Sequence, residues 1–243
     1  MRTKELVSSL TDWLAQQLKD SGLSGYVVGL SGGIDSAVVA ALCKKACPGN
    51  TLGIIMPCFS EKRDAEDAET TAKHFGIEFK TVSLNEVYRL LAETLTGKTL
   101  AELDKKDICL ANMKPRLRMT TLYFHANRRR ALVAGTSNRS ELAIGYFTKY
   151  GDGGADVLPI GNLLKFQVRE VAEYLGVPKP IIQRPPSACL WEGQVDAGEL
   201  GFTYDELDQY LLTGEASPTS RKKIEFLCGA NLHKKKIPPM PEF

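Results

Sequence analysis

The sequence predicts a doubly wound α/β fold, in which helices flank both faces of a parallel sheet. Two observations predict it. Short apolar runs alternate with longer stretches of helical period, which is typical of βα units. The first apolar run ends in a Ser-Gly-Gly turn that leads directly into a helical stretch. We expect one domain that spans residues 1–243, because a chain of this length can bury a full core.

Each element follows from a local pattern. The N-terminal segment MRTKELVSSLTDWLAQQL is amphipathic at helical spacing and does not resemble a signal peptide. Residues 61–76 and 164–176 predict amphipathic helices that close at Gly76 and Gly176. The expected strands are YVVGL (26–30), TLGIIMP (51–57), FKTVSL (79–84) and RALVAGT (130–136).

Two stretches are harder to assign. Residues 104–129 predict one long helix, in which Pro115 either starts the helix proper or kinks it. Residues 178–204 are rich in Pro and Gly and show no sustained period, so we expect a long loop there. Its central part, residues 183–202, suits a lid that shields a reactive intermediate from water.

Composition excludes several classes of protein. Thirty-one Lys and Arg against 29 Asp and Glu give a net charge of +2, which is too balanced for a dedicated nucleic-acid binder. No apolar run approaches the roughly 20 residues that span a bilayer. Six cysteines occur without a Cys-x-x-Cys pair, so we expect neither disulfides nor structural zinc. We therefore expect a cytoplasmic protein with no nucleic-acid or membrane partner.

The loop GLSGGIDSA (29–37) lies where a strand ends and a helix begins, and this geometry binds anions. Gly32 and Gly33 let backbone amides close on phosphate oxygens, and Ser31 and Ser36 add hydroxyl donors. A carboxylate at Asp35 is repelled by phosphate unless Mg²⁺ bridges them. A plain capped turn is the alternative, but the placement and the full Ser-Gly-Gly-x-Asp-Ser string favour phosphate binding.

The string SGGIDS resembles the pyrophosphate-binding loop of the ATP pyrophosphatases. Four further segments resemble the NAD synthetase family: NMKPRLRM (112–119), FTKYGDGGAD followed by LPIGNLLK (147–165), residues 185–211, and the closing HKKKIPP. The resemblance implies the adenine nucleotide alpha hydrolase-like, Rossmann-like fold. It also implies a homodimer with the substrate site at the subunit interface.

The resemblance assigns roles by position. It places Mg²⁺ on Asp35 and Glu141, and it gives catalytic roles to these two residues and Lys165. The implied ATP-binding residues are Gly29, Leu30, Ser31, Gly32, Gly33, Ile34, Asp35, Ser36, Thr136, Lys165 and Ser187. The implied deamido-NAD-binding residues are Arg116, Lys149, Asp156, His233 and Lys234.

The residues themselves support these roles unequally. Thr136 and Glu141 follow an expected strand, so they belong at the carboxyl edge of the sheet, where open α/β sheets bind ligands. Lys165 supplies positive charge that the loop lacks, although a surface lysine at a helix start is an equal alternative. The turn YGDGGAD and Arg116 also fit solvated surface, and a lone His233 is usually unremarkable.

The implied activity is ATP-dependent amidation of deamido-NAD to NAD, through an acyl-adenylate, with release of pyrophosphate and AMP. Free ammonia is the expected nitrogen source, because no cysteine lies in a recognisable nucleophile context. One alternative is a tRNA-modifying ATP pyrophosphatase, which should show Cys pairs or a basic RNA-binding domain. Another is a non-catalytic nucleotide sensor, which has little use for Asp35, Glu141 and Lys165 together.

Overall fold

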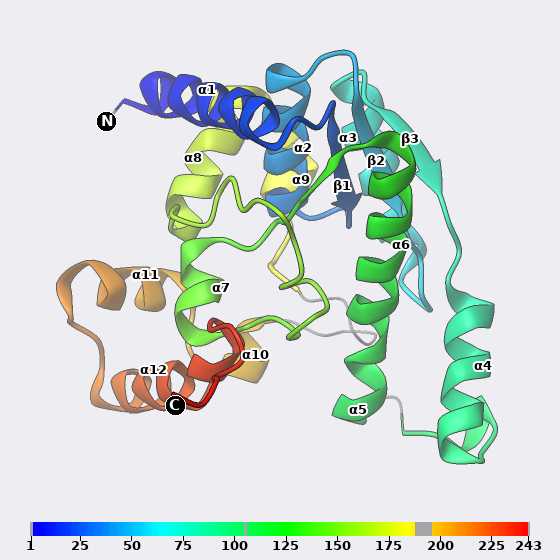
Figure 1. Cartoon of the computed structure of the whole chain (residues 1–243). Coiled ribbons are helices and arrows are strands. Elements are labelled where there is room, and N and C mark those ends of the chain that lie inside the picture. Colours follow the sequence, from blue (N-terminus) through cyan, green and yellow to red (C-terminus); the bar gives the residue numbers. More distant parts are fainter. Residues whose placement is uncertain (1, 105, 188–195, 243) are drawn as a thin grey trace.

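The computed structural model describes residues 2–104, 106–187 and 196–242. Its centre is a parallel four-stranded sheet flanked by helices, as predicted (Figure 1). The strand order is β3-β2-β1-β4. The strands are β1 (Tyr26–Leu30), β2 (Thr51–Ile55), β3 (Glu78–Thr81) and β4 (Leu132–Ala134). All four predicted strands exist, and three of them are shorter at their carboxyl ends than the apolar runs.

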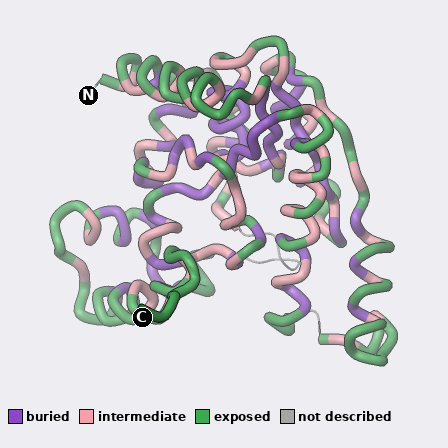
Figure 2. The backbone as a smooth tube through the Cα atoms, in the orientation of Figure 1, coloured by how far each residue is buried: buried purple, intermediate pink, exposed green. Residues whose placement is uncertain are grey.

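Apolar side chains from both faces of the sheet form separate cores. One core joins Val28 and Leu30 to helices that follow β1, β2 and β4 and to the N-terminal helix. These are α2 (Ile34–Ala46), α3 (Lys62–His74), α8 (Lys165–Leu175) and α1 (Thr3–Ser21). The other core joins Val27 and Ile54 to the opposite layer. That layer consists of α4 (Asn85–Thr96), η1 (Leu100–Glu102), α5 (Ile108–Ala111) and α6 (Met113–Arg129). Both faces are therefore covered, and β1, β2 and β4 are largely buried, whereas the edge strand β3 is mostly exposed (Figure 2).

The stretch 104–129 is not one helix. Two helices, α5 and α6, meet at Asn112, and Pro115 lies in the first turn of α6. A proline is tolerated there because the first amides of a helix have no partner within it. Pro115 therefore starts the long helix and does not kink it.

The C-terminal third is more helical than predicted. Within 178–204, where a loop was expected, the chain forms α9 (Lys179–Ile182) and α10 (Asp196–Leu200). These helices have only four and five residues, which is too short to show a helical period. They are followed by α11 (Tyr204–Thr213), α12 (Pro218–Ala230) and η2 (Leu232–Lys234). A third apolar cluster packs α10, α11 and α12 against α7 (Arg139–Ile144).

The strand order creates a switch point beside β1. The chain runs from β1 outward to β2 and β3, and then returns to place β4 on the other side of β1. Loops after β1 and β4 therefore diverge at the carboxyl edge of the sheet, where they leave a crevice. Among the described helices, none is long and apolar enough to cross a membrane.

Candidate functional site

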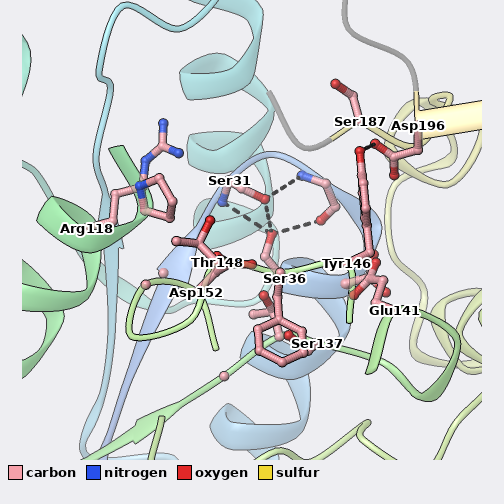
Figure 3. Close-up of a pocket in the computed structure, with 18 of the residues that line it drawn as sticks. Ser31, Ser36, Arg118, Ser137, Glu141, Tyr146, Thr148, Asp152, Ser187 and Asp196 are labelled. Atoms are coloured by element: carbon pink, nitrogen blue, oxygen red, sulfur yellow. Dashed lines mark hydrogen bonds between the residues drawn. The ribbon is translucent and has the colours of Figure 1, made fainter. Parts of the chain in front are cut away.

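The loop after β1 is held closed by its own hydroxyl groups. Ser36 Oγ donates to the carbonyl of Gly33 (2.8 Å) and accepts from Ser31 N (3.3 Å). The Gly33 amide in turn donates to Ser31 Oγ (3.2 Å). Figure 3 shows these bonds at the centre of the pocket. The loop thus keeps its amides and hydroxyls together at the start of α2, as anion binding requires.

Gly32 is fixed by both conformation and contact. Its φ is +81°, in the left-handed region that side chains disfavour. A Cβ at this position would lie 2.5 Å from the carbonyl oxygen of Asp64 on α3. Only glycine therefore lets the loop pack against α3 in this shape.

Lys165 lies between two carboxylates. Its Nζ is 2.5 Å from Asp35 Oδ2 and 3.3 Å from Glu141 Oε1. The lysine side chain is 3% exposed, and the carboxylate side chains are 17% and 16% exposed. The alternative of a surface lysine is therefore wrong. The three residues begin α2, α7 and α8, so the switch point brings three helix starts to one place.

Asn138 ties two of these residues together. Its Nδ2 donates to Asp35 Oδ1 (2.9 Å), and its Oδ1 accepts from the Glu141 amide (3.0 Å). The Asn138 amide donates back to Glu141 Oε2, which completes a capping box at the start of α7. Asn138 is fully buried, so this arrangement is fixed by packing.

Burial and the neighbouring opposite charges act in opposite directions on the pKa values of Glu141 and Lys165. Burial raises the pKa of Glu141 above its ordinary value, and Asp35 adds to the rise although Lys165 opposes it. Burial alone would lower the pKa of Lys165, but Asp35 and Glu141 together raise it. Lys165 is therefore a permanent cation at this site.

Two tyrosines bond to Asp196, and one of them, Tyr146, lines the cavity. Tyr146 donates to Asp196 Oδ1 (3.1 Å) and to Glu199 (2.9 Å), while Tyr204 donates to Asp196 Oδ2 (3.0 Å). The Tyr204 ring lies 4.9 Å from Lys165 Nζ. Burial and the adjacent carboxylates raise the pKa of both phenols, so they stay neutral donors. Figure 3 shows Tyr146 and Asp196 on the same side as Glu141.

These groups surround a cavity of about 670 Å³. Ten of the eleven predicted ATP-binding residues line it, and the eleventh, Gly32, is the residue of the same loop that packs against α3. Ser187 is among the lining residues and lies at the edge of the site (Figure 3). Residues 188–195, the centre of the predicted lid, lie outside the described residues.

The predicted deamido-NAD residues are more dispersed. Among the described residues that line the cavity, Lys234 is the one member of this set. Lys149 Nζ donates to the carbonyl of His233 (3.1 Å), which places these two beside Lys234. Asp156 accepts from Tyr123 Oη (3.0 Å) and from Val133 N (2.8 Å). Arg116 is exposed on α6.

Several residues at the site were not predicted. Arg118, two positions after Arg116, enters the cavity and donates to the Met56 carbonyl (3.2 Å) and to Ser60 Oγ (3.2 Å). Asn138 carries a sequence signal, since Asn followed by Glu three residues later is typical of a capping box. Asn138, Tyr146, Asp196 and Tyr204 meet only through the tertiary fold.

Comparison with known proteins points to one family. The family model for NAD synthase matches residues 6–238. An NH3-dependent NAD(+) synthetase of Carboxydothermus hydrogenoformans is 53% identical, covering 98% of this chain and 97% of that protein. A structure of an NMN synthetase from Francisella tularensis is 38% identical with a TM-score of 0.94, covering 100% of both chains. An NH3-dependent NAD synthetase from Campylobacter jejuni is 30% identical with a TM-score of 0.80, also covering 100% of both.

The loop geometry predicts different outcomes for its two adjacent glycines. Gly32→Ala should destabilise the protein by about 1–3 kcal/mol or more, because it adds left-handed strain and a clash with the Asp64 carbonyl. Gly33→Ala is the matched control, since its backbone is extended and its Cβ would meet only Ser31 Oγ at 3.4 Å. Urea unfolding of both variants measures the difference, and equal stabilities would contradict the proposed constraint.

Proposed function

The chain belongs to the NAD synthase family, whose known activity is ATP-dependent amidation of deamido-NAD, and we propose that it makes NAD with free ammonia. The nicotinate carboxylate attacks the α-phosphorus of ATP and releases pyrophosphate. Ammonia then attacks the acyl-adenylate carbonyl and expels AMP. The observation that carries the proposal is the meeting of the SGGIDS loop with Asp35, Glu141 and Lys165 at one switch point.

We propose that the loop after β1 binds the β- and γ-phosphates, which leave as pyrophosphate. Its glycines permit close approach, and its amides and hydroxyls are donors. Lys165 supports this role, because its buried ammonium supplies the positive charge that the loop lacks. Thr136 and Ser187 line the same cavity, which supports contacts to the rest of ATP.

The residues at the site fit Mg²⁺. Asp35 and Glu141 line the same cavity and contact the same ammonium, which supports a shared cation site. Carboxylate oxygens are ligands that Mg²⁺ prefers, and it commonly completes its shell with phosphates and water. Among the described residues, no group of three or more His, Cys, Asp or Glu is placed to hold a metal. We therefore propose that Asp35 and Glu141 hold Mg²⁺, which supplies neutralisation of the triphosphate charge.

The protein groups in this scheme position reactants and neutralise charge. Lys165 stays protonated, so it stabilises negative charge that develops on the phosphates. Tyr146 and Tyr204 fix Asp196 at the cavity wall and keep its oxygens occupied. The mechanism needs no covalent nucleophile, because AMP is already a good leaving group.

We further propose that the protein is a homodimer that completes the deamido-NAD site. Arg116, Thr120 and Phe124 share an exposed face of α6. Large exposed apolar side chains on α4 and α6 support a subunit contact there: Val87, Leu90, Leu95 and Phe124. Arg116 would then reach deamido-NAD bound mainly by the partner, while Lys149, Asp156, His233 and Lys234 would contact it within one subunit.

A second candidate substrate is the deamido form of NMN. The structure of an NMN synthetase superposes with a TM-score of 0.94, against 0.80 for an NH3-dependent NAD synthetase. Both reactions amidate the same nicotinate carboxylate. They differ in whether the site must also hold the AMP half of the dinucleotide.

The metal assignment predicts that Asp35→Asn and Glu141→Gln each lower the rate of adenylation. We expect a fall of roughly a hundredfold or more, since a lost metal ligand removes several kcal/mol of charge stabilisation. Pyrophosphate exchange into ATP measures this step. Glu170→Gln, an exposed position on α8, is the control. Near-wild-type exchange in either site variant would remove that residue from the metal site.

The dimer proposal predicts that Arg116→Ala raises KM for deamido-NAD far more than KM for ATP. It also predicts complementation between two variants that are each impaired when deamido-NAD is kept well below the KM of Arg116→Ala. A mixed dimer of Arg116→Ala and Asp35→Asn contains one site with both native residues, so mixing the two variants should restore activity. Activity that stays at the level of the separate variants would show that Arg116 does not act across the interface.

The activity itself is tested with purified protein, ATP, Mg²⁺ and either ammonium or glutamine. We expect ammonium to support NAD formation from deamido-NAD and glutamine not to do so. Parallel reactions with deamido-NMN compare kcat/KM for the two nucleotides. A higher value for deamido-NMN would establish the second candidate, and no product from either substrate would refute both.

A further inference from the structure

We infer that Asp208 on α11 is a positioning residue for Lys165 and Glu141. The inference rests on the proposed function, because it assigns Asp208 a task only through those two side chains. Asp208 itself is 2% exposed and does not line the cavity described by the structure. A buried carboxylate is unfavourable unless its oxygens are well bonded, so its contacts reveal its role.

Both oxygens of Asp208 bond to the helices that carry the site. Oδ1 accepts a short hydrogen bond from Ser140 Oγ in the first turn of α7. Oδ2 accepts from the amide of Phe166 in the first turn of α8 (3.0 Å). Ser140 Oγ also accepts from the amide of Lys165 (3.0 Å). Three bonds therefore join the starts of α7 and α8, and two of them end on the Asp208 carboxylate.

These bonds involve the backbone neighbours of the functional side chains. Ser140 directly precedes Glu141, and Phe166 directly follows Lys165. The first amides of a helix have no partner within it, and a negative charge there is favoured by the helix dipole. Asp208 accepts from the Phe166 amide directly, and through Ser140 Oγ it also holds the acceptor of the Lys165 amide. These bonds fix the distance between the two helix starts. The Glu141–Lys165 spacing follows from that distance.

The same helix also contacts the far end of Lys165. Tyr204 lies one turn before Asp208, and its ring is 4.9 Å from Lys165 Nζ. Helix α11 therefore contacts the Lys165 ammonium with Tyr204 and reaches the Lys165 amide through Asp208 and Ser140. A displacement of about 1 Å at such a site lowers rates by up to roughly a hundredfold.

The test compares Asp208→Asn with Asp205→Asn. Asp205 is the matched control because it also joins α11 to α8, through Arg169 (2.9 Å), but at the surface. We expect Asp208→Asn to lower kcat by roughly tenfold to a hundredfold with little change in KM for either substrate, and Asp205→Asn to change neither. Ser140→Ala provides a second test if Asp208→Asn does not fold.

A double-mutant cycle separates positioning from general destabilisation. In a Lys165→Met background, Asp208→Asn should lower the residual rate less than in the wild type, because part of its effect acts through Lys165. If the double variant loses activity by the full product of the two single-variant factors, the two residues act independently and the inference is wrong. Crystal structures of Asp208→Asn or Ser140→Ala give a readout independent of activity. A Lys165 ammonium that keeps its native distance to Asp35 would refute positioning, even if the proposed reaction itself proved wrong.

Discussion

The site depends on a single buried cation. The Lys165 ammonium lies where α2, α7 and α8 begin, and each of the two carboxylates facing it belongs to a different helix. Three charged side chains at one buried place are tolerable only if they stay close together. Asn138 and Asp208 maintain that geometry from two sides, one through Asp35 and Glu141 and one through the helix backbones.

Helix α7, which carries the Glu141 carboxylate, is held in place at both ends by other segments. This helix has only six residues, too few to be stable alone. Its start is bonded by Asp208 through Ser140. The C-terminal segment donates to carbonyls at the end of α7 and just beyond it. Lys235 bonds to Ala143 and Asn231 to Ile144 within the helix, and Lys234 bonds to Gly145 and Phe147 after it. The basic run near the C-terminus thus caps a helix, and Lys234 also faces the cavity.

The sequence predicted the parts of the protein that local patterns determine. Apolar runs identified all four strands, and the strand–turn–helix context identified the loop around Asp35. Because Thr136 and Glu141 follow an expected strand, they were placed at the same carboxyl edge of the sheet as that loop. Lys165 was left open, because a lysine at a helix start has the same local pattern whether it is buried or exposed. The short helices α9 and α10 and the contacts of Tyr204 and Asp208 arise from packing between segments far apart in the chain, which periodicity cannot show.

The separation of the paired residues bears on how the protein folds. Asp35 and Lys165 are 130 residues apart, and Ser140 and Asp208 are 68 apart. Contacts between residues far apart in the sequence form late. The chain must lose the conformational entropy of the intervening loop before such a contact can stabilise the fold. The sheet from β1 to β3 involves only the first third of the chain and can assemble while it is being synthesised. We therefore expect the loop after β1 to take shape early, and the charged centre beside it to form only once the C-terminal helices have docked.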